Sequence, residues 1–274
     1  MSRNWFSQDL ETVALFWRIL RTDGVALGFT THDADVWFDG ITHSASPGMV
    51  PSSIRKSAGF EADSAEVRGA ITHDSISSED LAAGRFDGAC VRIGLVDWET
   101  LESAVLYTGT IGTITEEDNG FHAELTSRKV ELTRDTIPRT SPTCRAPFAG
   151  PGCNLNPVHF EAERMIAACD VQANTVSFAD PLDPSLYAGG SLRWLDGPQT
   201  GMVMGIMGQN DAGDLVLDSP ISTETPSGTR VRLRQGCDHT LETCAQRFGN
   251  ALNFRGEPFL PGNDLLVRYP SVQS

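Results

Sequence analysis

The chain of 274 residues carries 21 Lys and Arg against 36 Asp and Glu, which gives a formal net charge of −15 at pH 7. So acidic a chain repels phosphate, which argues against wrapping nucleic acid or docking on an anionic membrane. Hydrophobic residues make up 40% of the chain, enough for a sizeable core. No uncharged window reaches the roughly 18 residues of a transmembrane helix, so we expect no membrane insertion. Asp9 and Glu11 interrupt the N-terminal apolar stretch, so we expect no signal peptide and folding in a cytoplasm.

Short strands joined by tight turns are predicted from the N-terminus onward. Asp23-Gly24 separates two runs of strand-forming residues, which predicts a hairpin from Val13 to Thr30. A helix over Leu10 to Leu20 is the alternative, because apolar residues there also recur at helical spacing. We favour the hairpin, since the Asp-Gly pair joins two runs of similar length.

Two more hairpins are predicted. One spans Val36 to His43 around Asp39-Gly40, and the other pairs Thr110–Glu116 with Phe121–Thr126 around Asp118–Gly120.

A short helix and two further strands are predicted between these hairpins. Ser77 can cap a helix that ends at Gly84, and residues 88–108 are expected to form the two strands.

The composition changes at Pro138. Residues Ser141 to Pro157 include four Pro, two Gly and two Cys, which predicts an irregular loop. A short helix is expected after Cys237, to about Asn250. Strands are predicted between these segments at Ala162–Cys169, Thr175–Ala179, Ser191–Leu195, Gly201–Met207, Asp214–Asp218 and Arg230–Arg234.

The expected fold class is mainly β with a few short helices, in two β lobes joined by a cysteine-bearing region. We expect an N-terminal β domain at 1–140, a cysteine loop at 141–157 and a second β domain at 158–235. A helix and C-terminal loop at 236–274 would then close the cysteine site.

Four of the six cysteines form two local pairs. Cys144 and Cys153 have eight residues between them, and Cys237 and Cys244 have six. Such pairs of thiolates are typical of a metal or iron–sulfur site, and zinc is one alternative. Buried free cysteines are the other, since Cys is among the most buried residue types. The remaining two lie in strand-like apolar runs and are predicted to be buried thiols: Cys90 and Cys169.

The neighbours of these cysteines favour thiolates. Asp238 can cap the following helix, which would leave Cys237 beside the positive helix end. Gly236 would let the chain bend back toward the other sulfurs. Arg145 and Arg247 are expected to offset the negative charge of the thiolates.

Other candidate chemistry is weak. Thr-His-Asp occurs at Thr31–Asp33 and at Thr72–Asp74, but adjacent strand residues point to opposite faces, so His32 and Asp33 should not converge. No nucleophile elbow, HExxH motif or phosphate-binding loop is present, so an enzyme is not expected. A run of methionines is expected to be core or interface packing: Met202, Met204 and Met207.

The chain resembles a family of phage minor tail proteins. Its C-terminal part is similar to the signature of that family, and several N-terminal motifs also fit. The family includes tail hub proteins of siphophage-like particles and of the gene transfer agents of alphaproteobacteria, and the iron–sulfur tail-tip protein of phage lambda is a relative. The matching stretches are Asp23-Gly24, Phe29–Asp33, Phe38–Gly40, Ala83–Ala89, Cys237–Asn250, Asn253–Gly256 and Pro258–Gly262.

This resemblance implies a structural, non-enzymatic component of a virion tail tip, assembled in the bacterial host cytoplasm. A homotrimeric hub would join the sixfold distal tail protein to a threefold baseplate or central fibre protein of the megatron type. DNA would cross its channel without specific binding, and acidic walls suit that passage.

The resemblance also implies a structural four-iron, four-sulfur cluster on Cys144, Cys153, Cys237 and Cys244. A cytoplasmic iron–sulfur redox or sensor protein and a zinc-stapled adaptor are the alternatives.

Overall fold

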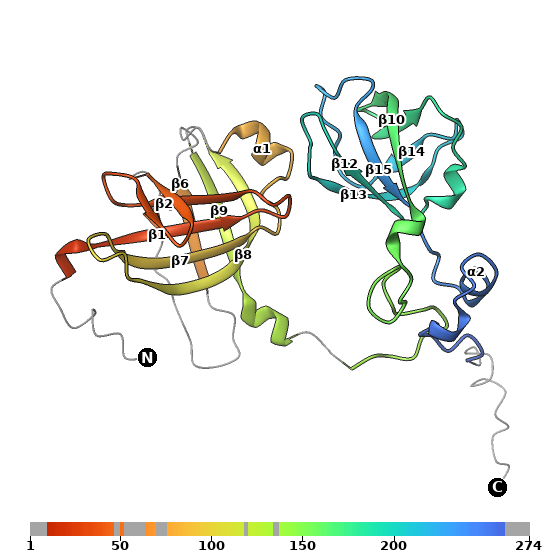
Figure 1. The fold of residues 1–274 in the computed structure, drawn as a ribbon, viewed down its shortest axis with the longest axis horizontal. Coiled ribbons are helices and arrows are strands. Elements are labelled where there is room, and N and C mark those ends of the chain that lie inside the picture. Colours follow the sequence, from red (N-terminus) through yellow and green to blue (C-terminus); the bar gives the residue numbers. More distant parts are fainter. Residues whose placement is uncertain are drawn as a thin grey trace, which may run out of the picture. The chain divides into compact units, whose positions relative to one another are not determined.

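The computed structural model describes residues 10–46, 50–51, 64–69, 76–117, 120–133 and 137–260. The chain separates into two compact units, Met1–Asp135 and Thr136–Ser274. Each unit is built mainly from β-strands, and the helices among the described residues are short (Figure 1). The predicted fold class, mainly β in two lobes, is confirmed.

The first unit is one strongly curved nine-stranded sheet (Figure 1). Its strands are β1 Val13–Leu20, β2 Ala26–Thr30, β3 Val36–Phe38, β4 Ile41–Ala45, β5 Val50–Pro51, β6 Ser64–Gly69, β7 Cys90–Asp97, β8 Ser103–Glu117 and β9 Gly120–Ser127. They lie in the order β3-β4-β2-β1-β7-β8-β9-β6-β5. The β2–β4 pair is parallel, and the other described pairs are antiparallel.

Strand β1 is buried on both faces of this sheet. Successive side chains of a strand point to opposite faces. Phe16 accordingly packs with Val36 and Phe38 on one face, while Trp17 packs with Ile93 on the other. Apolar residues on both faces leave no polar alternation, which is why a helix was a reasonable alternative for this run.

The first two predicted hairpins are confirmed. Strands β1 and β2 pair in register from Phe16–Thr30 to Leu20–Ala26, so the favoured hairpin is present and the alternative helix over 10–20 is not, apart from a 3₁₀ turn at Leu10–Thr12. Strands β3 and β4 pair around Asp39 and Gly40, whose φ angles are 52° and 78°. Asp and Gly tolerate these left-handed angles, which the tight turn requires.

The predicted helix is also present, as α1 Ser78–Ala82. The Ser77 side chain accepts a hydrogen bond from the Asp80 backbone N–H at 3.1 Å. Gly84 follows the helix with a φ of 72°, as expected of a residue that ends a helix.

The sequence predicted that a strand ends by residue 108 and that a new hairpin strand begins at Thr110, and this division is wrong. Strand β8 runs unbroken from Ser103 to Glu117 and pairs first with β7 and then with β9. Register shifts lie at Ile93/Gly94 and Ile111/Ile114, where bulges let a long strand follow a curved sheet. The third hairpin is confirmed by the β8–β9 pairing, and Asp118 and Asn119 of its turn lie outside the described residues.

The second unit holds a closed six-stranded barrel. Its order, β10-β11-β14-β13-β12-β15, closes on itself through the β10–β15 pair, and all six predicted strands are confirmed. The strands are β10 Glu161–Asp170, β11 Thr175–Phe178, β12 Ser191–Trp194, β13 Val203–Gln209, β14 Leu215–Leu217 and β15 Arg230–Arg234.

Alternation along each strand fills the barrel interior. Leu192 and Trp194 of β12 and Leu233 of β15 are fully buried, while the intervening Arg193 is exposed. The methionine run is only partly core, because Met204 is buried and Met207 on the same strand is 71% exposed.

The cysteine segments of the second unit lie outside the barrel. No helix or strand interrupts residues 137–156, so the predicted loop is confirmed. Helix α2 covers Leu241–Gln246, shorter than the helix predicted to reach Asn250. Its N-cap is Thr240, not Asp238, because the left-handed φ of 62° at His239 keeps the chain from entering a helix there. The Asp238 carboxylate instead accepts hydrogen bonds from the Thr240 backbone N–H and hydroxyl, both at 2.9 Å.

Candidate metal centre

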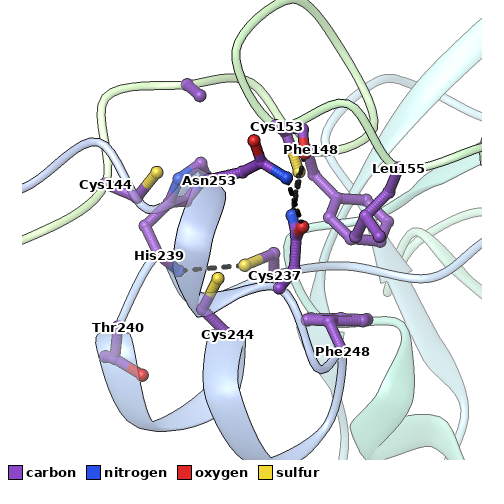
Figure 2. A pocket seen from close by; sticks show the side chains of 12 residues that line it. Cys144, Phe148, Cys153, Leu155, Cys237, His239, Thr240, Cys244, Phe248 and Asn253 are labelled. Atoms are coloured by element: carbon purple, nitrogen blue, oxygen red, sulfur yellow. Dashed lines mark hydrogen bonds between the residues drawn. The ribbon is translucent and has the colours of Figure 1, made fainter.

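Four cysteines line one pocket of the second unit. Cys144, Cys153, Cys237 and Cys244 turn their sulfur atoms toward the space between the loop and α2 (Figure 2). Cys153 and Cys244 are buried, and the other two are half-buried. The other lining residues are Ala146, Phe148, Leu155, His239, Thr240, Phe248, Asn250 and Asn253.

Close backbone contacts bring the cysteine segments together. A Cβ on Gly236 would lie 1.8 Å from the Ala188 carbonyl oxygen, so no larger residue fits before Cys237. The sequence predicted a bend at Gly236, and the structure adds that this close approach to the barrel connection requires glycine. A Cβ on Gly256 would lie 2.5 Å from the Thr143 carbonyl oxygen, where the C-terminal segment crosses the residue before Cys144.

The His239 backbone joins two of the cysteines. Its N–H donates to the Cys237 sulfur at 3.4 Å (Figure 2), and its carbonyl accepts the Cys144 N–H at 2.8 Å. The left-handed conformation at His239 positions both groups, and such a conformation is costly for a residue other than glycine.

Two other N–H groups point at cysteine sulfur. The Arg255 backbone N–H donates to the Cys144 sulfur at 3.3 Å, and the Asn250 side-chain amide donates to the Cys153 sulfur at 3.5 Å. Three of the four sulfurs therefore have a donor, which is an environment that stabilises thiolate. Sequence reasoning missed all three donors, because two are backbone groups and the third is an amide without chemistry of its own.

An ion pair fixes the Cys144 loop to the C-terminal segment. The Arg145 guanidinium donates to both oxygens of Glu257 at 2.6 and 2.9 Å. Glu257 also accepts the Ser141 N–H at 2.9 Å. The Arg145 hydrogen bonds are the main cause that lowers the Glu257 pKa to about 2. The guanidinium thus forms these hydrogen bonds with this carboxylate, which are the largest cause that raises the Arg145 pKa, while the nearby Cys144 is among the smaller causes.

Arg247 is likewise engaged away from the sulfurs. One of its nitrogens donates to the Leu186 carbonyl at 2.8 Å and to the Gln235 side chain at 2.7 Å. Its guanidinium lies 4.8 Å from the Phe248 ring centre. Arg247 thus attaches the end of α2 to the barrel, and among the described residues none of these contacts reaches a cysteine sulfur.

Burial raises the pKa of two of the thiols. For Cys244 the largest cause is burial, followed by the nearby Cys144, Cys237 and Cys153. For Cys237 burial again comes first, and the His239 N–H acts in the opposite direction. The four groups are therefore close enough to disfavour one another's charge, and ionising them together requires a compensating cation.

An aromatic cluster covers one side of the pocket. The ring centres of Phe148 and Phe248 lie 4.8 Å apart, and each lies 5.4 Å or less from the ring of Phe160. Apolar walls limit access of water to bound metal, which favours a stable thiolate-ligated group.

The donors in the pocket fit a thiolate-bound metal group, since four thiols and no carboxylate line it. Within the described ranges, no three His, Cys, Asp or Glu side chains form a group that could hold one metal ion. The four thiols instead lie around the walls of a shared space.

The other cysteines lie elsewhere. Cys90 begins β7 in the first unit, and Cys169 belongs to β10 on the barrel. Both are half-buried, so the prediction that they are buried thiols is met only in part. Cys169 packs against the barrel core, and burial raises the pKa of its thiol.

The Thr-His-Asp prediction is also corrected. His32 and Asp33 do converge, with 3.2 Å between His32 Nδ1 and Asp33 Oδ1. They lie in a bend after β2, where strand alternation does not apply. His32 Nδ1 also accepts a hydrogen bond from the Ala34 backbone N–H and lies 3.1 Å from the Ala34 carbonyl oxygen. His32 and Asp33 lie at the surface, where Asp33 is almost fully exposed. The second copy, Thr72–Asp74, lies outside the described residues.

Two family models match the chain. One, described as baseplate hub protein, N-terminal attachment domain, matches residues 2–156, which include Cys144 and Cys153. The other, described as phage conserved hypothetical protein BR0599, matches residues 185–264, which include Cys237 and Cys244. Because the first match spans more than half of the chain, the protein belongs to the family of baseplate hub proteins.

A solved structure agrees with this assignment. A chain of the structure titled "Virion of native gene transfer agent (GTA) particle" is 31% identical, with a TM-score of 0.82. The match covers 98% of this chain and 95% of that chain. No curated protein matches the sequence. None of the described helices has the length and hydropathy needed to cross a membrane. The chain is therefore a structural component of a virion baseplate, as the resemblance predicted.

Proposed function

We propose that this baseplate hub protein is the tail hub of a siphophage-like particle or gene transfer agent. In this role a homotrimer joins the sixfold distal tail ring to the threefold baseplate or central fibre protein. The full-length similarity to a chain of a gene transfer agent virion supports this role. The net charge of −15 suits a wall along which DNA passes without binding.

We further propose that Cys144, Cys153, Cys237 and Cys244 hold a four-iron, four-sulfur cluster with a structural role. The observation that carries this proposal is the pocket itself, in which four thiols from two remote segments face one space. When bound, the cluster would supply iron–sulfur bonds that tie the 137–156 loop to the α2 segment. Metal binding contributes folding free energy to such segments, which have little core of their own.

The protein residues around the pocket would prepare the thiols for this cluster. Burial keeps Cys237 and Cys244 protonated in the absence of a cation, so binding must release protons. The N–H groups of His239, Arg255 and Asn250 then stabilise the resulting thiolates. The glycines at 236 and 256 hold the two segments close enough to share ligands.

Two experiments test the two parts of this proposal. Iron, zinc and sulfide analysis of the anaerobically purified chain, with absorbance near 400 nm, tests the cluster. If the chain contains zinc but no sulfide, the cysteines hold a structural zinc ion and the proposed cluster is wrong. An electron-microscopy reconstruction of whole particles tests the hub: the proposal expects three copies at the tail end below the last sixfold ring. A chain absent from the particle, or present with another symmetry, would refute it.

A further inference from the structure

We propose that Asn250 is a positioning residue for the metal group, through the hydrogen bond from its amide to the Cys153 sulfur. This inference depends on the proposed cluster and adds to it a residue that tunes the cluster. The structure assigns Asn250 this role because it contacts two cysteines from different segments and because its amide is held in one orientation.

The amide nitrogen is committed to Cys153. Asn250 Nδ2 donates to the Cys153 carbonyl oxygen at 2.8 Å and to the Cys153 sulfur at 3.5 Å. The side chain is buried, with 9% of the residue exposed. Because the amide is buried, water competes little with the sulfur for its N–H group.

The orientation of the amide is fixed from its oxygen side. Asn253 Nδ2 donates to Asn250 Oδ1 at 2.8 Å, and Asn154 Nδ2 donates in turn to Asn253 Oδ1 at 3.3 Å. Because Oδ1 of Asn250 accepts a hydrogen bond, the nitrogen of the same amide must face Cys153. Three amides thus form one directed chain that ends on a cysteine sulfur.

The backbone of Asn250 reaches a second cysteine. Its N–H donates to the Cys244 carbonyl oxygen at 2.9 Å, which closes the turn that follows α2. Asn250 therefore connects the backbone of Cys244 to the sulfur of Cys153, across the two segments that the cluster would join.

A hydrogen bond to a ligating sulfur withdraws electron density from it. Donors to cluster sulfurs are among the factors that set reduction potential, and their removal leaves the oxidised state relatively favoured. Partners of metal ligands typically contribute 10–100-fold in metal affinity. Loss of the Asn250 donor should therefore lower the reduction potential and speed the loss of iron.

Asn250→Asp, made in the full chain purified without oxygen, removes the donor with almost no change in size. Its carboxylate also adds a negative charge that would itself lower the potential, so the uncharged Asn253→Ala variant separates loss of the donor from added charge. Asn156→Asp is the matched control, because Asn156 lies in the same loop region as Cys153 but caps a turn with its oxygen, a task that Asp performs equally. Asn253→Ala is a second test variant, since it keeps Asn250 but removes the group that orients it. The readouts are the reduction potential, from a redox titration followed by electron paramagnetic resonance, and the rate at which a chelator removes iron.

We expect Asn250→Asp to lower the reduction potential and to raise the rate of iron loss by about tenfold or more. Asn253→Ala should change both quantities in the same direction by less, and Asn156→Asp should match the wild type. A potential and release rate in Asn250→Asp equal to those of the wild type would overturn the inference. If Asn250→Asp holds no cluster, a reduction potential and an iron-release rate in Asn253→Ala equal to those of the wild type would overturn the inference. Wild-type protein without iron and sulfide would refute the proposed cluster itself.

Discussion

The barrel and the cysteine segments belong to one unit but are stabilised in different ways. The barrel strands bury Ile166, Leu192, Trp194, Met204 and Leu233 almost completely in one shared core. The cysteine segments have one helix of six residues and short 3₁₀ turns, and their buried groups include the sulfurs of Cys153 and Cys244.

This contrast indicates where the proposed cluster would stabilise the fold. A closed barrel satisfies its backbone hydrogen bonds internally and gains stability from apolar burial. The cysteine segments instead depend on contacts that cross between remote residues, such as Arg145 with Glu257. We therefore expect the barrel to fold without metal and the cysteine segments to require it.

The largest expected effect is the loss of the metal group in Cys144→Ser or Cys237→Ser. Either change should abolish iron binding, destabilise the cysteine segments and block particle assembly, because the proposed cluster would supply much of the folding free energy of these segments. Iron analysis, hydrogen exchange and electron microscopy of particles check this. Cys90→Ser and Cys169→Ser are the controls and should keep their iron, whereas equal effects at all six positions would contradict the separation of ligands from other thiols.

Trp194→Ala tests the barrel side of the comparison. Trp194 is 1% exposed within the barrel core, and truncation of such a side chain costs about 3–5 kcal/mol. Urea unfolding should show this loss, while the folded fraction should still bind iron normally. The neighbouring exposed residue provides the control, since Arg193→Ala should change stability by about 0.5 kcal/mol or less. Iron loss in folded Trp194→Ala would mean that the two regions are not independent.

A pH dependence is expected in the first unit, whose core contains a buried polar group. His43 accepts a hydrogen bond from Arg18 Nε at 2.9 Å, and burial, with Arg18 second, lowers its pKa to about 4. A lowered histidine pKa means that the unfolded chain binds the proton first. The stability of the first unit should therefore be fully present above pH 6.5 and fall as the pH drops toward 4.

His43→Gln removes this titrating group and keeps an acceptor for Arg18. Thermal unfolding between pH 6.5 and 4 should show a shallower decline in this variant than in the wild type. Parallel pH profiles for the two proteins would rule out His43 as the source.

The smallest effect is expected from Glu257→Gln. The change weakens the Arg145 fork, but the pair is partly exposed, so its contribution is modest. Hydrogen exchange near residues 141–145 should become faster while iron binding persists. Glu242→Gln on the surface of α2 is the matched control. An exchange rate near Cys144 that does not change would show that the backbone contacts around Gly256 hold the segment alone.

Local sequence signals predicted most strands correctly. Asp39-Gly40 marked a hairpin because few other pairs tolerate its φ angles, and Ser77 with Gly84 marked both ends of α1. The parallel β2–β4 pair and the continuous strand β8 could not be predicted. Both depend on contacts between distant residues and on bulges, which leave no periodic pattern in the sequence.

The sequence also predicted that Cys144, Cys153, Cys237 and Cys244 belong together, and the pocket gathers them. The groups that position them were not predictable. His239 acts through a left-handed backbone, and Asn250 acts through a chain of amides that only the folded structure aligns.

The iron and acid-labile sulfide content of the full chain, purified without oxygen, tests the proposed cluster most directly. We expect four irons and four sulfides for each chain, lost in Cys144→Ser and retained in Cys169→Ser. A protein that contains neither iron nor sulfide, and whose cysteine segments are as stable as in the particle, would contradict the proposed cluster.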